Sequence, residues 1–510
     1  MQNRTEVRWR RPRYPWLRFA LALSLASALV LSVSGLHPVA QIGPEASLDE
    51  FIEYLTDRIP ALISTYGIPG VSTVLIYDGE IVWFEAFGYS DLESGQKMTP
   101  QTYCRVQSIS KPVTAWGVMR LVEEGKIALD DPIHQHLAGF RLPPSDFSGD
   151  RVSIRQLLSH TSGMAMGRLG LRYSPLEERP SLLESLSEDV HLQQEPGSSF
   201  HYSNAGFNLL ELLIEDVTLT DFSEYMEEQI LVPLSMRQSS FTWSEDFDPP
   251  VPFGHDLKGD RTEVYVYSER ASGGLFASAL DIGRFLTAGM DGSEVRGRGV
   301  LSPEAVDMLH TVEVEIGPPY GLAFDSYGLG HYIETLSDGK YAISHGGQGY
   351  GWMSHFHSVP ATGDGIVILA NSQRSWPFFS YVLSDWAAWR GFPSVGMGRI
   401  VLAKRILWGL IGFSLFALFT KLWGLTEELM RGDRSFAPLS RICPVLRLIQ
   451  ALIALSIAAL LIYVADQDYL FISSVFPIAS LWIFITLLAA SVLLTLLSLL
   501  PHRGSAGSRG

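Results

Sequence analysis

The stretch VSTVLIYDGEIVWFEAF, residues 71–87, decides how this chain begins to fold. Its two halves, 71–77 and 80–87, are rich in β-branched and aromatic residues, which favour strands. Between them stands Asp78-Gly79, a dipeptide typical of two-residue hairpin turns. The sequence therefore predicts an antiparallel hairpin at this point.

The elements around this hairpin predict the α+β class. A capping box, Ser47-Leu48-Asp49-Glu50, opens a helix before it, and that helix stops at Gly67. From Ser108 to about Val300 the pattern is mainly helical. Strand patterns return near 341–346, 351–358 and 365–371, and a helix near 376–390 follows. We therefore expect one domain over 43–395, an antiparallel sheet closed by distant segments and carrying a helical insertion.

Apolar segments at both ends of the chain explain a mean hydropathy of +0.15 with only 18% charged residues. In residues 1–40 a basic stretch precedes an apolar run, which fits either a cleaved signal peptide or a retained anchor. Residues 399–510 contain three candidate membrane spans. These cover about 406–423, 448–464 and 470–500, with Pro477 allowing a turn within the third.

The basic residues between these spans predict their orientation. The first connection carries Lys421, Arg431, Arg434, Arg441 and Arg447. The second connection, 465–468, carries no basic residue. The positive-inside rule then places the first connection and the tail in the cytoplasm and the large domain outside, although Lys404 and Arg405 lie against that scheme. We expect a multi-pass protein of the cell membrane with an extracytoplasmic domain.

The charge of the middle segment excludes one class of partner. Residues 41–398 carry 22 basic and 48 acidic side chains, a net charge of −26. Nucleic-acid binding needs a basic face, so we expect none. The two cysteines, Cys104 and Cys443, are too few for a disulfide scaffold.

A serine and a lysine three residues apart, Ser108 and Lys111, are the first candidates for catalysis. At a helix start they share one face, so the lysine amine can accept the serine proton. Two other pairs with this spacing, at 94–97 and 337–340, stand in glycine-containing turns that do not fix them. Only Ser108 opens an amphipathic helix pattern; the alternative is an ordinary helix cap.

Two further motifs accompany this pair. Residues 196–204 form a turn that leads into a helix and presents Tyr202 and Asn204 together. A tyrosine beside a lysine can act as a shared acid or base, although a buried structural tyrosine is the alternative. His345-Gly346-Gly347-Gln348 ends a strand, where glycine allows another backbone to approach closely, or marks a simple bulge.

The order of these motifs resembles that of a known family, the penicillin-recognising serine hydrolases. The similarity is greatest to the class C β-lactamase-related branch, with its D-Ala-D-Ala carboxypeptidases, D-aminopeptidases and esterases. It rests on Ser108-Ile109-Ser110-Lys111, Tyr202-Ser203-Asn204 and His345-Gly346-Gly347, with support from 155–163, 196–204 and 272–278. The resemblance covers about 47–390 and implies a β-lactamase/transpeptidase-like fold.

The resemblance also implies roles for individual residues. Ser108 corresponds to the acylated nucleophile and Lys111 to its proton acceptor. Tyr202 corresponds to the residue that shuttles protons, and Asn204 to one that orients substrate and lysine. The backbone N–H groups of Ser108 and Gln348 would form the oxyanion hole. No metal and no cofactor are expected.

His345 departs from the pattern of the lactamases, which keep a lysine there. An imidazole is mostly neutral at pH 7, so the substitution favours a peptide or ester substrate over a lactam. We expect this ring to line the site, with Arg374 as the alternative contact for a substrate carboxylate. His355 and His357 alternate on a neighbouring strand pattern, but no zinc motif accompanies them.

Together these features predict a membrane-anchored extracytoplasmic serine hydrolase that works through an acyl-enzyme. Its expected substrates are D-amino-acid-containing peptides, such as those of the cell wall, or related amides and esters. The alternatives are a broad esterase of the same fold and a catalytically silent cell-wall-binding sensor that binds peptidoglycan. The intact Ser108, Lys111 and Tyr202 argue against the silent alternative.

Overall fold

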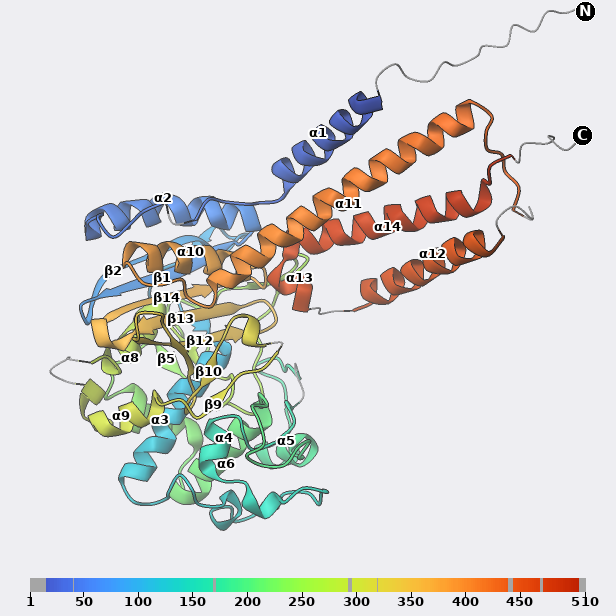
Figure 1. The fold of residues 1–510 in the computed structure, drawn as a ribbon. Helices are drawn as coiled ribbons and strands as arrows, with labels where there is room; N and C mark the ends of the chain where they lie inside the picture. Colours follow the sequence, from blue (N-terminus) through green and yellow to red (C-terminus); the bar gives the residue numbers. More distant parts are fainter. Residues whose placement is uncertain are drawn as a thin grey trace, which may run out of the picture. The chain divides into compact units, whose positions relative to one another are not determined.

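The computed structural model describes residues 15–39, 41–167, 171–291, 296–318, 320–438, 444–467 and 471–503 (Figure 1). The chain divides into two compact units. One is Pro38–Val401, and the other combines Met1–His37 with Leu402–Gly510. The basic stretch before residue 15, Ala40, Arg441 and Cys443 lie outside the described residues.

An antiparallel sheet forms the centre of the 38–401 unit. In the described residues its strand order is β3-β2-β1-β14-β13-β12-β11-β10-β9. The strands are β1 Gly70–Tyr77, β2 Glu80–Asp91, β3 Gln96–Lys97, β9 Val314–Glu315, β10 Ser326–Tyr327, β11 Tyr332–Thr335, β12 Tyr341–Gln348, β13 Met353–Val359 and β14 Asp364–Ala370. Shorter pairings join β4 Cys104–Arg105, β8 Phe276–Ala277 and β5 Ser239–Ser240, and β6 Gly254–His255 with β7 Arg261–Thr262.

The predicted hairpin is confirmed, and so is the closure of the sheet by distant segments. Asp78 and Gly79 both have positive φ, 52° and 78°, in the turn between β1 and β2. On its other side β1 pairs with β14, so that Val71 lies opposite Ala370. The edge strands β9, β10 and β11 were not predicted. They are two to four residues long, too short for an alternating pattern to stand out.

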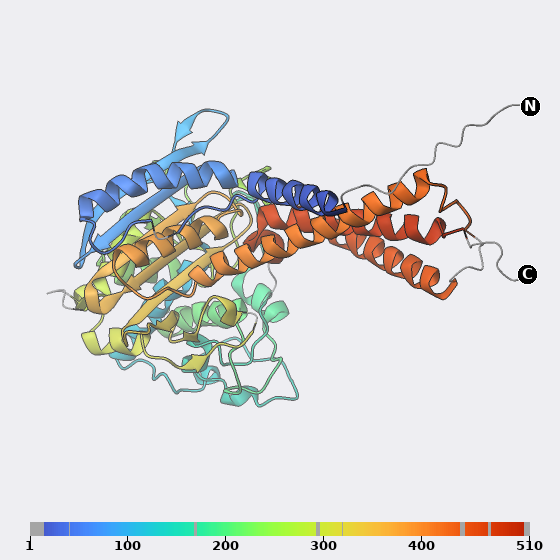
Figure 2. The ribbon, with the colours of Figure 1, turned by 45° about the horizontal axis from the view of Figure 1, so that its top comes forward.

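Helices cover both faces of this sheet (Figures 1 and 2). On one face, Phe51 of α2 stacks on Trp389 of α10, with ring centroids 4.2 Å apart. On the other face α8 packs so closely that a Cβ on Gly283 would lie 3.0 Å from Val74. The helices of this unit are α2 Leu48–Tyr66, α3 Ser110–Glu123, α4 Ile154–Leu158, α5 Leu182–Asp189, α6 Asn204–Thr218, α7 Phe222–Met226, α8 Ala279–Ala288, α9 Pro303–Leu309 and α10 Trp376–Trp389.

The register of β12 and β13 separates three histidines. His345 lies opposite Phe356, whereas Gly346 lies opposite His355. Side chains alternate along a strand, so His345 projects toward the helical insertion and His355 and His357 project toward α10. The packing agrees, because the ring of His357 lies 5.6 Å from that of Trp386 on α10.

The second unit contains long apolar helices. Three of the described helices are long and apolar enough to cross a membrane: α11 Gly398–Met430, α12 Pro444–Ala465 and α14 Pro477–Leu499. The third predicted span is broken before Pro477, because a short helix, α13 Phe471–Val475, ends two residues before α14 begins. The first helix, α11, has 33 residues and extends beyond both ends of the predicted span, 406–423.

Helix α1, Pro15–Val33, packs antiparallel to α11 within this unit. Arg18 near its start forms an ion pair of 2.8 Å with Glu427 near the end of α11. At the opposite end, Lys404 Nζ donates a hydrogen bond of 2.6 Å to the Gly35 carbonyl. Lys404, which does not fit the predicted orientation, therefore has a backbone carbonyl as its hydrogen-bond acceptor.

Candidate active site

Ser108 lies in a 3₁₀ turn, Gln107–Ile109, immediately before α3. The sequence predicts a helix starting at Ser108, whereas α3 begins at Ser110. The helix is also not amphipathic over its first part, because every residue from Ser110 to Met119 is buried. Ser110, Lys111 and Thr114 tolerate burial because their side chains are hydrogen-bonded; Ser110 Oγ, for example, donates to the Gln107 carbonyl at 2.6 Å.

Lys111, one turn after Ser108, points its amine at three oxygen atoms. Lys111 Nζ lies 3.2 Å from Ser108 Oγ, 2.7 Å from Asn204 Oδ1 and 2.7 Å from the Ser272 carbonyl oxygen. The side chain is fully buried. Burial disfavours the ammonium form and holds the pKa of Lys111 well below its ordinary value. A neutral amine beside a serine hydroxyl can accept the serine proton.

Tyr202 completes the group around Ser108. Its ring centroid lies 4.9 Å from Lys111 Nζ, and its side chain forms a hydrogen bond with Ser108. Burial raises the pKa of Tyr202, and the hydrogen bond with Ser108 opposes that rise only partly. The phenol therefore stays protonated at neutral pH and can donate its proton.

The loop before α6 is fixed at several points. Ser203 Oγ donates to the Ala165 carbonyl at 2.6 Å and accepts from the Gly206 N–H at 2.9 Å, which caps α6. The Asn204 N–H donates to the Met166 carbonyl at 2.9 Å. These bonds hold the Asn204 side chain against Lys111.

Strand β12 passes very close to the turn that carries Ser108. A Cβ on Gly347 would lie 2.1 Å from the Val106 carbonyl oxygen and 2.2 Å from Ser354 Oγ, so no side chain fits there. Gly346 is less constrained, since a Cβ would lie 3.3 Å from His355 Nδ1. The Gln348 side chain accepts a hydrogen bond of 3.0 Å from Trp376 Nε1. The sequence prediction of a close backbone approach is thus met at Gly347.

Gln107 holds an unusual backbone conformation beside the serine. Its φ is +54°, a region that costs a non-glycine residue on the order of 1 kcal/mol. Tyr267 donates to its Oε1 at 3.0 Å, and its Nε2 donates to the Tyr265 hydroxyl at 3.2 Å. The two tyrosines stabilise the turn that presents Ser108.

His345 is fully buried rather than open to a substrate. Its Nδ1 lies 2.8 Å from the Gly346 carbonyl oxygen, so Nδ1 carries the proton, and Nε2 accepts from the Tyr327 hydroxyl at 3.1 Å. Burial holds the pKa of His345 well below its ordinary value. The ring is therefore neutral, and both of its nitrogens have partners inside the protein.

Arg374, the alternative contact for a substrate carboxylate, binds the protein backbone. Its Nε donates to the Leu257 carbonyl at 2.9 Å. Its guanidinium lies against the backbone at Gly259, where a Cβ would be 3.3 Å from it. This placement gives Arg374 a structural role.

Several residues of the site were not predicted from the sequence. The ring of His160 lies 4.3 Å from that of Tyr202, and its Nδ1 accepts from the Ser203 N–H at 3.2 Å. Only the motif at 155–163 could have pointed to it. The motif at 272–278 marked the segment of Ser272 but not the role of its carbonyl, and nothing in the local sequence marks Tyr327.

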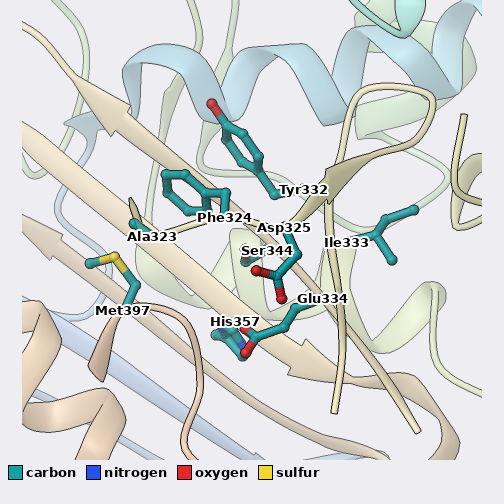
Figure 3. A pocket seen from close by; sticks show the side chains of 9 residues that line it. All are labelled: Ala323, Phe324, Asp325, Tyr332, Ile333, Glu334, Ser344, His357 and Met397. Carbon is teal, nitrogen blue, oxygen red and sulfur yellow. The ribbon is translucent and has the colours of Figure 1, made fainter. Parts of the chain in front are cut away.

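A separate hollow lies on the other face of the sheet (Figure 3). It is lined by Ala323, Phe324, Asp325, Tyr332, Ile333, Glu334, Ser344, His357 and Met397. Burial raises the pKa of Glu334 to about 7. Ser344 and His357 project away from His345, so this hollow is not part of the site around Ser108.

Comparison with known proteins agrees with this geometry. The family model described as Beta-lactamase matches residues 48–381. Protein flp of Staphylococcus aureus (strain N315) is 27% identical over 202 residues, 39% of this chain, and the chain spans only 40% of that relative's length.

Two solved structures have a similar fold. The octameric penicillin-binding protein homologue from Pyrococcus abyssi superimposes with a TM-score of 0.59 at 26% identity, covering 71% of this chain and 81% of that one. A class C β-lactamase shares the fold, with a TM-score of 0.54 at 20% identity over 64% of this chain and 93% of that one. With the family model covering most of the 38–401 unit, the chain belongs to the β-lactamase family of penicillin-recognising serine hydrolases.

Proposed function

We propose that this protein is a membrane-anchored serine hydrolase whose nucleophile is Ser108, and that it works through an acyl-enzyme. The observation that carries this proposal is the contact of 3.2 Å between Ser108 Oγ and the buried amine of Lys111. Two oxygen acceptors, Asn204 Oδ1 and the Ser272 carbonyl, fix the direction of that amine. A lysine held in this way is suited to general-base chemistry.

The proposed reaction uses Lys111 as the base and Tyr202 as the acid. Ser108 Oγ attacks the substrate carbonyl carbon while its proton passes to Lys111 Nζ. When the tetrahedral intermediate collapses, the bond to the leaving group breaks, and Tyr202 gives its proton to the leaving nitrogen or oxygen. Tyr202 then recovers a proton from Lys111. The directions of both pKa shifts, downward for Lys111 and upward for Tyr202, support these starting states.

The backbone N–H groups of Ser108 and Gln348 are the proposed oxyanion hole. The close approach of β12 at Gly347 supports this role, because it holds the end of the strand beside the serine turn. Gly346 and His345 then serve as structural parts of the strand. We assign His345 to positioning, since its ring is buried and hydrogen-bonded to Tyr327.

The proposed substrates are D-amino-acid-containing peptides, such as those of peptidoglycan, or related amides and esters. One support is the relative of 26% identity that is described as a penicillin-binding protein homologue. Another is the neutral imidazole of His345 at the place where lactamases carry a lysine. The domain would act outside the cell, because Arg431 and Arg434 lie in the connection after α11 and Arg447 lies in the first turn of α12.

The test is intact-mass spectrometry of the full chain after exposure to benzylpenicillin, a muropeptide ending in D-Ala-D-Ala, and p-nitrophenyl acetate. We expect a covalent adduct on Ser108 that is absent in Ser108→Ala and retained in Ser337→Ala, the matched serine of an exposed S-x-x-K turn. Adducts from the ester alone would favour the esterase alternative. An adduct that survives Ser108→Ala would refute the nucleophile assignment.

Orientation is tested separately by single cysteines at Gly432 and Gln467. The proposal expects Gly432→Cys to be shielded from an impermeant maleimide in intact cells and Gln467→Cys to react. The reverse labelling pattern would place the hydrolase domain in the cytoplasm.

A further inference from the structure

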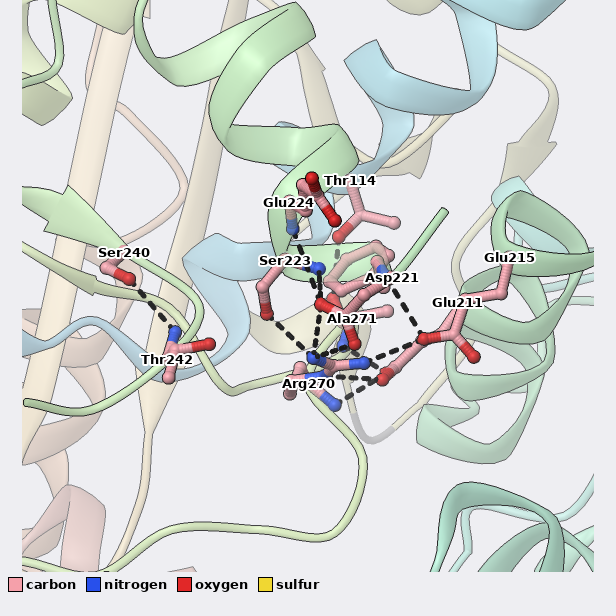
Figure 4. Close-up of polar contacts among 11 residues, drawn as sticks. Thr114, Glu211, Glu215, Asp221, Ser223, Glu224, Ser240, Thr242, Arg270 and Ala271 are labelled. Atoms are coloured by element: carbon pink, nitrogen blue, oxygen red, sulfur yellow. Dashed lines mark hydrogen bonds and ion pairs between the residues drawn. The ribbon is translucent and has the colours of Figure 1, made fainter. Parts of the chain in front are cut away.

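A fully buried carboxylate, Glu211, lies two helical turns beyond Asn204 on α6. Residues seven apart on a helix share a face, so Asn204 and Glu211 lie on the same face of α6. Asn204 contacts Lys111 directly. Glu211 instead contacts the segment 270–272 (Figure 4).

Glu211 holds this segment through its backbone. One carboxylate oxygen, Oε2, accepts from the N–H groups of Arg270 at 2.6 Å and Ala271 at 2.8 Å. The other oxygen, Oε1, accepts from Arg270 Nε at 2.8 Å. Two adjacent amides bound by one oxygen fix the orientation of the peptide groups that follow them.

The next two carbonyl groups of the segment contact α3. The Ala271 carbonyl accepts from Thr114 Oγ1 at 2.9 Å, and the Ser272 carbonyl accepts from Lys111 Nζ at 2.7 Å. A lysine amine has few directions for hydrogen bonding, and two of them are taken by the Ser272 carbonyl and Asn204. The remaining direction of the Lys111 amine points at Ser108 Oγ.

Arg270 balances the buried charge of Glu211. Its guanidinium also pairs with Glu215 at 2.8 Å and with Asp221 at 3.0 Å, and it donates to Ser223 Oγ at 2.8 Å. Figure 4 shows these groups converging on Arg270 from α6 and α7. Burial raises the pKa of Glu211, and the Arg270 guanidinium and the two backbone amides oppose that rise.

We propose that Glu211 is a positioning residue for Lys111: by fixing the 270–272 backbone, it holds the Ser272 carbonyl where that group directs the amine toward Ser108. The inference rests on the proposed role of Lys111 as the base. An ion pair between Glu211 and Arg270 that only stabilised the fold would not need the two backbone amides, of Arg270 and Ala271, that precede the Ser272 carbonyl.

The test measures the burst of p-nitrophenol released when p-nitrophenyl acetate acylates the full chain. This burst gives the rate of acylation and the number of active sites separately. The burst amplitude counts correctly folded sites, and the burst rate reports how well Lys111 activates Ser108. In Glu211→Gln we expect a full amplitude per folded molecule with a rate at least tenfold lower. We also expect the pH midpoint of the rate to move, because the hydrogen bonding of Lys111 changes.

Asp221→Asn is the matched control, because Asp221 also pairs with Arg270 but contacts neither backbone amide of the segment. Its rate should stay within twofold of that of the unmodified protein. A Glu211→Gln protein with a reduced amplitude but an unchanged rate and pH midpoint would show a purely structural role and overturn the proposal.

If Glu211→Gln does not fold, Thr114→Val provides the test, because it removes the bond from α3 to the Ala271 carbonyl with little change of shape. A two- to fivefold lower rate at full amplitude supports the proposal, and an unchanged rate refutes it. Ser108→Ala keeps the two proposals apart. A burst that persists in Ser108→Ala rejects the nucleophile itself, whereas its loss alongside a normal Glu211→Gln rate rejects only the positioning role.

Discussion

The hydroxyl of Tyr327 lies 3.1 Å from Nε2 of His345, and this contact shows which tautomer the histidine adopts. Because Nδ1 faces the Gly346 carbonyl at 2.8 Å, the neutral ring satisfies both nitrogens at once. A second proton on Nε2 would place a charge on a fully buried ring, which burial disfavours. The fold therefore keeps neutral the residue that stands where lactamases carry a permanent cation.

One prediction follows for substrates that carry a carboxylate. The ratio of kcat/KM for a carboxylate-bearing ester to that for a neutral ester should stay constant within twofold from pH 6 to 8. The reason is that the pKa of His345 lies well below its ordinary value, so no charge appears at this position in that range.

The control for this ratio is Glu334→Gln, because the pKa of Glu334 is about 7 and this group titrates in the same range outside the site. A tenfold rise of the ratio toward pH 6 that persists in Glu334→Gln would show that His345 titrates and meets the substrate. That result would contradict the buried placement of the ring.

The pH dependence of acylation tests Lys111. The amine must lose its proton to act, and burial lowers its pKa, so the rate should reach its plateau well below pH 10.5. Lys111→Arg should lower acylation about 10²–10⁴-fold at every pH, because a guanidinium does not deprotonate. Lys340→Arg, the lysine of the matching turn, should change nothing. A rate still rising at pH 10 in the unmodified protein would argue against a buried neutral base.

Gly347→Ala tests the close approach of β12. The new methyl group would lie within 2.2 Å of the Val106 carbonyl and Ser354 Oγ, so strand and serine turn must separate. We expect a loss of stability of about 1–3 kcal/mol and acylation at least a hundredfold lower. Gly139→Ala is the control, since open space surrounds a Cβ there. Normal acylation in Gly347→Ala would mean that the strand's distance from Ser108 is not critical.

His357 gives a prediction for stability against pH. Burial lowers its pKa to about 4, and within the described residues neither ring nitrogen has a hydrogen-bond partner. Between pH 6.5 and 4 the unfolded chain thus binds more protons than the folded one, so the free energy of unfolding falls as the pH falls. This one residue should account for a loss of about 2 kcal/mol between pH 7 and 5.

Replacing His357 by leucine should remove that part of the pH dependence. Hydrogen exchange of the amides of β13, measured on the full chain in detergent at both pH values, reports the change. His191→Leu, at an exposed position, serves as control. If the free energy of unfolding depends on pH equally in His357→Leu and the unmodified protein, the His357 ring does not cause that dependence.

The ion pair between Arg18 and Glu427 predicts that α1 stays in the mature protein. The pair joins α1 to α11, and the bond from Lys404 to the Gly35 carbonyl joins their other ends. Mass spectrometry of the protein isolated from membranes should therefore find the residues of α1 intact. Arg18→Glu should weaken detergent resistance of the fold, and adding Glu427→Arg should restore it. A mature chain that begins after residue 36 would refute the retained anchor.

The sequence by itself determined the class of fold, the hairpin at Asp78-Gly79 and the family, because these depend on local patterns. Turn residues, alternating strands and an S-x-x-K spacing act over a few residues, where backbone conformation is set. Only the tertiary structure decided that His345 is buried against Tyr327, that His355 and His357 lie on the opposite face, and that Glu211 supports the acceptor of Lys111. These relations join segments tens to hundreds of residues apart, and burial, which sets the charge of each group, exists only once those segments have packed.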